Sequence, residues 1–241
     1  DMELRRFFVT PEDVRGDTVT VTGGEFVHMT RVLRMKPGYK AVVCADDGKE
    51  RLCTVKEIGN GYALLSQDEV RDADRKKVSL TLFTGLLKNS KLDFVVQKAV
   101  ELGVDKIVPF VSAYTAEKKF NAERANKIAL EAAKQCGSVW LSRVEEPVTF
   151  DEVTAEFGKF DTVLFAYEGD RLHSLKNTEI RGTSLALVVG SEGGFRPDEA
   201  ERAVACGAKA ITLGRRILRA ETAGIVGAAL VLDAAGELDY D

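Results

Sequence analysis

The spacing of apolar residues changes near residue 77, and this change sets the main limit on the fold. Beyond it, short apolar runs alternate with segments in which apolar residues recur every three or four positions. Short runs are typical of buried parallel strands and the second spacing of helices, which predicts an α/β domain with a parallel sheet. The expected strands are 78–84, 106–110, 162–166, 185–189 and 210–213, and the expected helices cover 91–101, 122–136, a stretch from Pro197, and 221–235.

The amino-terminal part has a different pattern, with short extended pieces at 18–22, 41–44 and 62–65. Turn signals separate them, namely Gly23-Gly24, Asp47-Gly48 and Asn60-Gly61. Such dipeptides favour tight hairpins, so this part predicts a small barrel or sandwich. A short helix is expected at 25–35 and a charged linker at 68–77, which gives two domains, 1–72 and 73–241.

Composition excludes several classes of protein. The chain has 34 Lys and Arg against 38 Asp and Glu, a net charge of −4, so a uniformly basic surface is excluded while a local basic face is not. No apolar run approaches the roughly 20 residues that cross a bilayer, and we expect a soluble cytoplasmic protein without membrane contact. The four cysteines and two histidines lack metal-ligand spacing, so we expect no metal and reduced, mostly buried thiols.

One glycine-containing stretch, 188–197, ends an apolar strand and opens a helix at Pro197. Its glycines, Gly190, Gly193 and Gly194, let backbone amides approach a ligand at the carboxyl edge of a sheet. Neither the dinucleotide fingerprint nor a phosphate loop is present, because the required spacings are absent. A binding loop and a plain strand-to-helix turn both remain open on this pattern.

A second stretch, 213–223, carries Arg215, Arg216 and Arg219 beside Glu221. Three arginines within five positions favour bidentate binding of phosphate or carboxylate. The alternative is a solvated loop with an internal ion pair to Glu221.

In order and spacing, these pieces resemble the bacterial 16S ribosomal RNA uridine-N3 methyltransferases, a family of the SPOUT class. The resemblance covers nearly the whole chain and is carried by Arg5–Phe8, His28, Val32–Met35, Pro37–Gly38, Gln97–Val104, Pro109, Glu131–Gly137, Gly190–Phe195, Leu213–Gly214 and Ile217–Ala223. It implies a PUA-like RNA-binding β-barrel, followed by a trefoil-knotted methyltransferase domain that forms a homodimer. It also implies S-adenosylmethionine as cofactor, with 16S ribosomal RNA of the small subunit as partner.

The same resemblance implies which residues form the site. Three loops would bind the cofactor, through Phe165, Ala166, Tyr167, Glu168, Gly190, Ser191, Glu192, Gly193, Gly194, Leu213, Gly214, Ile217, Leu218, Arg219 and Ala220. Uracil N3 carries a proton at neutral pH, so methylation requires its removal or stabilisation of the anion spread over O2 and O4. The candidates are Arg219 with Arg6 or Arg34 for the anion, and Glu221 as base or as a partner that orients an arginine.

Some positions depart from the family pattern. Tyr114 and Ser138 stand where arginine is usual, Ser142 where proline is usual, and Ser191 where proline is common. Fewer cations would weaken phosphate contacts, which affects the choice of substrate more than that of cofactor. Alternatives are therefore another RNA acceptor on the same fold, or a paralogue that binds RNA or cofactor without turnover.

Overall fold

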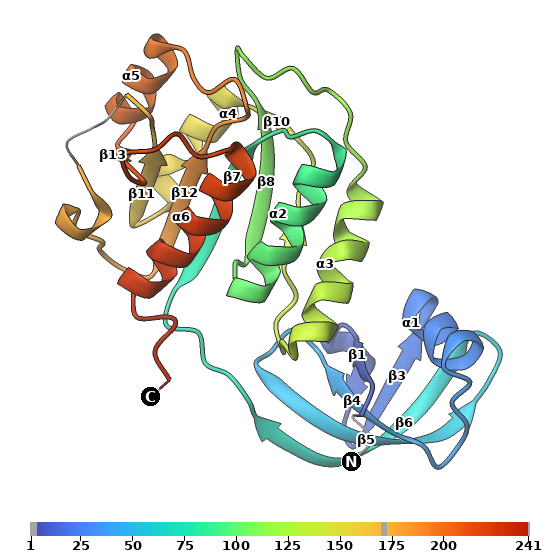
Figure 1. Ribbon diagram of the computed structural model, residues 1–241. Helices are drawn as coiled ribbons and strands as arrows, with labels where there is room; N and C mark the ends of the chain where they lie inside the picture. Colours follow the sequence, from blue (N-terminus) through green and yellow to red (C-terminus); the bar gives the residue numbers. More distant parts are fainter. Residues whose placement is uncertain (1–3, 170–172, 241) are drawn as a thin grey trace. The chain divides into compact units, whose positions relative to one another are not determined.

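The computed structural model describes residues 4–169 and 173–240, and the chain divides into two compact units (Figure 1). The first unit comprises Asp1–Arg75 with Ala133–Leu141, and the second comprises Lys76–Ala132 with Ser142–Asp241. The segment Ala133–Leu141 lies far along the chain from the rest of the first unit. Sequence periodicity gave no indication that it belongs there.

The first unit is built on a sheet with the strand order β1-β4-β5-β6-β3-β2. Its strands are β1 (Arg6–Phe8), β2 (Val14–Arg15), β3 (Thr18–Thr22), β4 (Lys40–Cys44), β5 (Lys49–Ile58) and β6 (Tyr62–Asp72). Alternate residues such as Val19 and Val21 point into a core with Phe7, Met29 and Leu65. The hairpins expected at Asp47-Gly48 and Asn60-Gly61 are confirmed, since both turns join antiparallel strands, whereas Gly23-Gly24 begins a helix and forms no hairpin.

The expected linker at 68–77 is wrong for its first half, because β6 continues to Asp72. Its charged residues pair with the long strand β5, whose Lys49 lies opposite Asp72. They are the solvated end of a strand, held by ion pairs such as Arg71–Glu50 at 2.9 Å. A charged composition alone did not distinguish such an end from a linker.

The helix expected at 25–35 is formed by α1 (Gly23–Val27), which continues into the π-helical turn η2 (His28–Val32). A 3₁₀ turn, η1 (Pro11–Asp13), lies between β1 and β2. The expectation of mostly buried thiols holds for Cys44 and Cys53 and is wrong for Cys136 and Cys206, which are exposed.

The second unit contains the parallel sheet that the sequence predicts, with the order β10-β8-β7-β12-β11-β13 and β9 beside β8. Its strands are β7 (Ser79–Gly85), β8 (Lys106–Val111), β9 (Arg143–Val144), β10 (Val148–Thr149), β11 (Thr162–Ala166), β12 (Ser184–Val189) and β13 (Lys209–Ile211). Its helices and short turns are α2 (Asn89–Leu102), α3 (Ala122–Cys136), α4 (Phe150–Ala155), η3 (Phe157–Lys159), η4 (Leu175–Asn177), α5 (Pro197–Ala205) and α6 (Ala220–Ala234).

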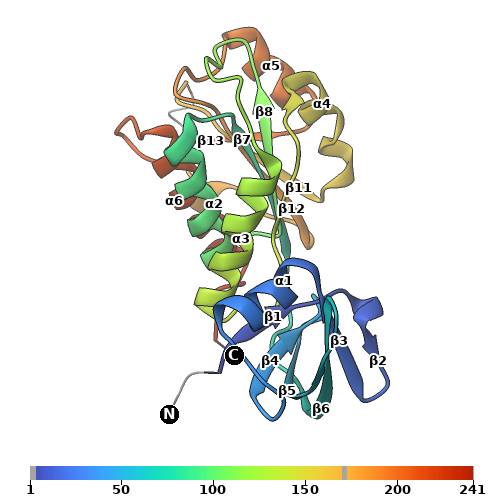
Figure 2. The same cartoon turned by 90° about the vertical axis from the view of Figure 1, so that its right-hand side faces the viewer.

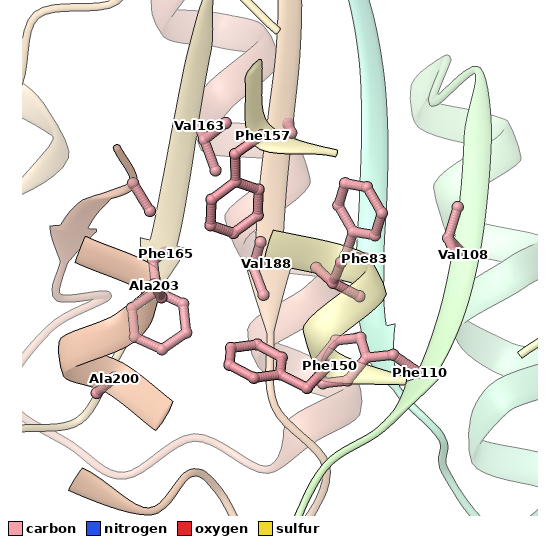
Figure 3. Packing of buried hydrophobic residues seen from close by; sticks show 13 residues of the cluster. Phe83, Val108, Phe110, Phe150, Phe157, Val163, Phe165, Val188, Ala200 and Ala203 are labelled. Carbon is pink, nitrogen blue, oxygen red and sulfur yellow. The ribbon is translucent and has the colours of Figure 1, made fainter. Parts of the chain in front are cut away.

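Helices cover both faces of this sheet. On one face α6 packs beside α2 and against β7 and β12 (Figures 1 and 2). Gly227 permits this approach, since a Cβ there would lie 2.9 Å from Leu187 of β12. On the other face Phe83, Phe165 and Val188 pack with Phe150 of α4 and Ala203 of α5 (Figure 3).

Burial on both faces explains why the strands are apolar throughout. The α/β class is confirmed, and the expected strands and helices occur in the expected order, with β9, β10 and α4 as additional elements between α3 and β11. The trefoil knot remains a prediction.

Candidate functional site

A cleft of about 920 Å³ opens where β11, β12 and β13 end. These strands run parallel, so the loops that follow them leave the same edge of the sheet. This edge is where open parallel sheets bind ligands. The predicted residues that line the cleft are Ala166, Tyr167, Glu168, Gly190, Ser191, Glu192, Gly193, Gly194, Leu213, Gly214, Ile217, Leu218, Arg219, Ala220 and Glu221.

Phe165 does not line the cleft. It is the penultimate residue of β11 and fully buried. Its ring lies 4.7 Å from that of Phe195 and 5.6 Å from that of Tyr167, measured between centroids. Because side chains of a strand alternate between faces, Phe165 belongs to the core and supports the wall from behind.

The glycine loop, residues 190–194, is shaped by close contacts with other segments. A Cβ on Gly85, the last residue of β7, would overlap the backbone of Ser191, and one on Gly190 would lie 2.9 Å from the Phe195 ring. Gly194 has a φ of +66°, which favours glycine. The loop is therefore held in one path along the cleft.

A turn from the end of β8 supports the same loop. A Cβ on Gly193 would lie 2.5 Å from the carbonyl oxygen of Tyr114, and the hydroxyls of Thr115 and Ser191 are 3.5 Å apart. Glu199, only 3% exposed, accepts hydrogen bonds from the backbone N–H groups of Ala113 and Arg196, at 3.2 and 3.0 Å. This buried carboxylate ties the turn to the start of α5.

The arginine loop between β13 and α6 lines the cleft with Arg215, Arg216 and Arg219. Among the described residues, Arg215, Arg216 and Arg219 are exposed and form no ion pair. The internal pair with Glu221, considered as an alternative, is absent within this part of the chain. Glu221 instead lines the cleft with a buried Oε2 that has no hydrogen-bond partner among the described residues.

Arg6 and Arg34 belong to the first unit and are not among the residues that line the cleft. Arg6 donates to Glu50 Oε1 at 2.6 Å and to the Ser138 carbonyl at 3.3 Å. Burial lowers the pKa of Arg6, but the interactions with Glu50 and Cys44 together outweigh burial, so its pKa lies above the usual value. Arg34 is exposed with a φ of +52°, an uncommon conformation for a residue with a side chain.

Sequence reasoning missed part of the lining. Lys91, in the first turns of α2, lines the cleft and forms an ion pair with Glu192 at 3.3 Å. Its signal was its place just after β7, because the helix that follows a parallel strand starts at the ligand-binding edge. Thr212, Phe195 and Ala223 also line the cleft and had no individual signal.

No cluster of three His, Cys, Asp or Glu side chains suited to a metal ion occurs among the described residues. In the same residues, no helix is both long and apolar enough to span a membrane.

Comparison with known proteins now defines the class. The family described as RNA methyltransferase domain matches residues 74–232, and the RNA methyltransferase PUA domain matches residues 21–67. The chain is therefore an RNA methyltransferase that carries a PUA domain.

Individual relatives narrow this class. Ribosomal RNA small subunit methyltransferase E of Bacillus subtilis is 32% identical over 91% of this chain and 93% of its own length. The Synechocystis protein of the same name is 30% identical over 94% of this chain and 76% of its own. The structure of the Neisseria gonorrhoeae protein of that name, bound to S-adenosyl methionine, superposes with a TM-score of 0.82 at 25% identity, covering 96% and 98% of the two chains. The chain belongs to the ribosomal RNA small subunit methyltransferase E family.

Proposed function

We propose that this protein transfers the methyl group of S-adenosylmethionine to N3 of a uridine in 16S ribosomal RNA. The observation that carries the proposal is the cleft at the edge of the parallel sheet, where the glycine loop faces Arg219 and Glu221. Membership of the methyltransferase E family supports the same substrate class.

The cleft fits a nucleoside cofactor. Its volume of about 920 Å³ lies within the usual range for small-molecule sites. A Cβ at Gly194 or Gly214 would meet no atom within 4 Å, so the backbone at both positions is open to a ligand. The unpartnered Oε2 of Glu221 leaves an acceptor for a bound group. The residues expected to hold the cofactor are the backbone of 190–194 and of 213–220, with Tyr167 and Glu168 from the third loop.

S-adenosylmethionine, when bound, supplies a methyl group that is already activated for transfer. The protein must then align the uracil with this methyl group and remove the proton from N3. We assign Glu221 to accept that proton, because the residue lines the cleft and its buried Oε2 has no hydrogen-bond partner among the described residues. Arg219 is assigned to stabilise the negative charge on O2 and O4, since its guanidinium is not committed to an ion pair among the described residues. This chemistry requires no metal.

We also propose that the protein is a cytoplasmic homodimer that associates through the methyltransferase unit. Val226 and Leu230, one helical turn apart on α6, are 36% and 41% exposed. Ile217 in the arginine loop is 82% exposed. An exposed apolar stripe of this kind is typical of a surface that is buried in an assembly.

The decisive experiment is methyl transfer from labelled S-adenosylmethionine to small ribosomal subunits that lack the modification, followed by nucleoside mass spectrometry. Formation of 3-methyluridine is expected. Another methylated nucleoside would replace the proposed acceptor by a different RNA position. Cofactor binding without transfer to any ribosomal RNA would make the chain a binding paralogue.

A further inference from the structure

The Tyr114 turn, residues 112–115, presents an aromatic ring on a fixed backbone. The backbone N–H of Ser112 donates to Thr115 Oγ1 at 2.9 Å, and that of Thr115 donates to the Ser112 carbonyl at 3.1 Å. The buried carboxylate of Glu199 holds Ala113 between them. Yet the Tyr114 side chain is 52% exposed. The turn is therefore rigid while its largest side chain faces solvent.

The Tyr114 side chain leaves the backbone next to the cleft. The Cβ of Tyr114 lies 2.8 Å from where a Cβ on Gly193 would stand, and Gly193 lines the cleft. Only a glycine allows the loop and the turn to approach so closely. Tyr114 is thus presented directly next to the segment assigned to the methyl donor.

Three lysines gather around Glu117, two residues after the turn. Lys88, Lys118 and Lys119 are exposed, and none has an ion-pair partner in the described ranges. The intervening carboxylate of Glu117 accepts hydrogen bonds from the backbone N–H groups of Lys119 and Lys118, both at 2.8 Å. These bonds, with the charges of Lys119 and Lys88, hold the pKa of Glu117 below its usual range.

Two lysines of the second unit that lie away from the turn differ from these three, because each has an ion-pair partner. At the opposite edge of the sheet, Lys159 and Lys106 pair with Glu156 and Glu145 at 2.8 and 3.8 Å. The free cations of the Tyr114 side thus mark a surface suited to an anion that extends over several charges.

We propose that Tyr114 stacks on a base next to the target uridine, while Lys88, Lys118 and Lys119 bind the adjoining phosphates of single-stranded RNA. An exposed aromatic ring among cations is the usual pattern for single-stranded RNA, because every base has a face on which a ring stacks. This inference rests on the proposed function and adds a substrate-contacting residue to it.

The test for the ring compares Tyr114→Ala, Tyr114→Phe and a control, Tyr240→Ala, whose tyrosine is fully exposed near the carboxyl terminus. Tyr114→Ala is expected to lower kcat/KM for unmodified 16S ribosomal RNA by about tenfold, with an unchanged Kd for S-adenosylmethionine. Tyr114→Phe keeps the stacking face and should match the wild type. Normal RNA kinetics in Tyr114→Ala, a loss in Tyr114→Phe, or a parallel loss of cofactor affinity would each overturn the stacking role.

The test for the cations is the salt dependence of binding to a short uridine-rich RNA. Lys118→Ala/Lys119→Ala should reduce the slope of log Kd against log salt by about 0.7 for each phosphate that the variant no longer binds. Lys106→Ala/Lys159→Ala removes the same charge at the opposite edge and should leave the slope unchanged. Equal slopes in the two double variants would overturn the binding of phosphates by these lysines.

Failure of this inference is distinguishable from failure of the proposed function. If the wild type binds RNA but makes no 3-methyluridine, the function fails while the binding comparisons still decide the inference. If the wild type methylates and the Tyr114 variants behave normally, only the inference fails. Absence of any RNA binding by the wild type overturns both.

Discussion

Two residues of the cleft, Arg219 and Glu221, differ from most charged residues of the second unit because their charged groups have no partner among the described residues. Elsewhere in the second unit many carboxylates and guanidinium groups are committed, as in Arg196–Asp198 at 2.8 Å and Arg124–Asp93 at 2.7 Å. Arg219 and the Oε2 of Glu221 are not, within the residues described. Groups without internal partners at a concave site are suited to a bound molecule, because binding satisfies them.

Replacing Arg219 by alanine is therefore expected to lower the single-turnover rate of methyl transfer by about 100-fold or more, the loss typical of one stabilising donor. Folding should be intact, since Arg219 is exposed and, as the residue before α6, caps that helix without a side-chain hydrogen bond. Arg219→Lys keeps the charge without the fork of donors and should show an intermediate rate. Near-wild-type turnover in Arg219→Ala, with saturating RNA and cofactor, would remove Arg219 from the mechanism.

The thiols give a second test at this scale. Burial raises the pKa of Cys44, and burial together with the nearby Asp68 raises the pKa of Cys53 to about 12. The thiolate is the reactive form, so both residues should resist alkylation at neutral pH. Cys136 and Cys206 are exposed and should react. Titration with a disulfide reagent should count about two fast thiols in the native protein and four after denaturation; four fast thiols would contradict this burial.

Among the secondary-structure elements, those with long buried runs were predictable from the sequence. The strand expected at 162–166 and the helix expected at 122–136 have the observed bounds of β11 and α3. Periodicity missed β9 and β10, because two residues carry no periodic signal. It also missed α4, although the capping box of Thr149 and Glu152 announces that helix.

The site was only partly predictable for a related reason. Each of its three loops follows an apolar strand, so parallel pairing alone places them at one edge. Which side chain faces the cleft depends on the side of the sheet to which it points. The sequence does not give that side, and Phe165, expected at the cofactor site, is buried in the core. The support by the Tyr114 turn depends on contacts between distant segments, about which local periodicity carries no information.

The contact between β7 and the glycine loop predicts that a change in β7 alters cofactor binding. Gly85→Ala would push a methyl group into the backbone of Ser191, so the loop must shift. We expect a loss of about 1–3 kcal/mol in the free energy of unfolding and at least tenfold weaker binding of S-adenosylmethionine. Calorimetric titration and thermal unfolding measure both.

Gly158→Ala provides the matched control, because a Cβ there meets no atom within 4 Å. It should bind the cofactor as the wild type does. Unchanged cofactor affinity in Gly85→Ala would show that the path of the glycine loop does not control the site.

For the molecule as a whole, we predict that a charge on the exposed face of α6 prevents the proposed dimer from forming. Leu230→Glu places a charge in the exposed apolar stripe of α6 without touching the buried face that Gly227 and Ala228 present. Sedimentation velocity should show a dimer for the wild type and a monomer for this variant. Val204→Glu, which places the same charge at an exposed apolar position of α5 outside this stripe, is expected to remain dimeric. A monomeric wild type would end the proposal.

The first unit is formed by two separate segments of the chain, and this arrangement leads to a prediction about its stability. Residues 133–141 belong to this unit, and their side chains and backbone bind charged and aromatic groups of its other part. Lys134 Nζ lies 2.5 Å from Glu25 and 5.3 Å from the centre of the Phe7 ring, and Asp46 accepts a hydrogen bond from the backbone N–H of Leu141. Without the segment, Glu25 loses its cation while its side chain, 14% exposed in the intact protein, lies over a core that becomes more accessible to solvent.

The fragment 1–75 should therefore be less stable than the same unit in the full chain by about 1–3 kcal/mol, since it loses the ion pair of Lys134 with Glu25 and the hydrogen bond from Leu141 to Asp46, each worth roughly 1 kcal/mol. A peptide of residues 122–141 should raise its midpoint of urea unfolding in a concentration-dependent way. The same peptide with Lys134→Ala should do so much less, because it restores the backbone contacts without the cation. If the fragment unfolds at the same urea concentration with and without the peptide, residues 133–141 are an accessory to the first unit, and its own sheet is sufficient for its stability.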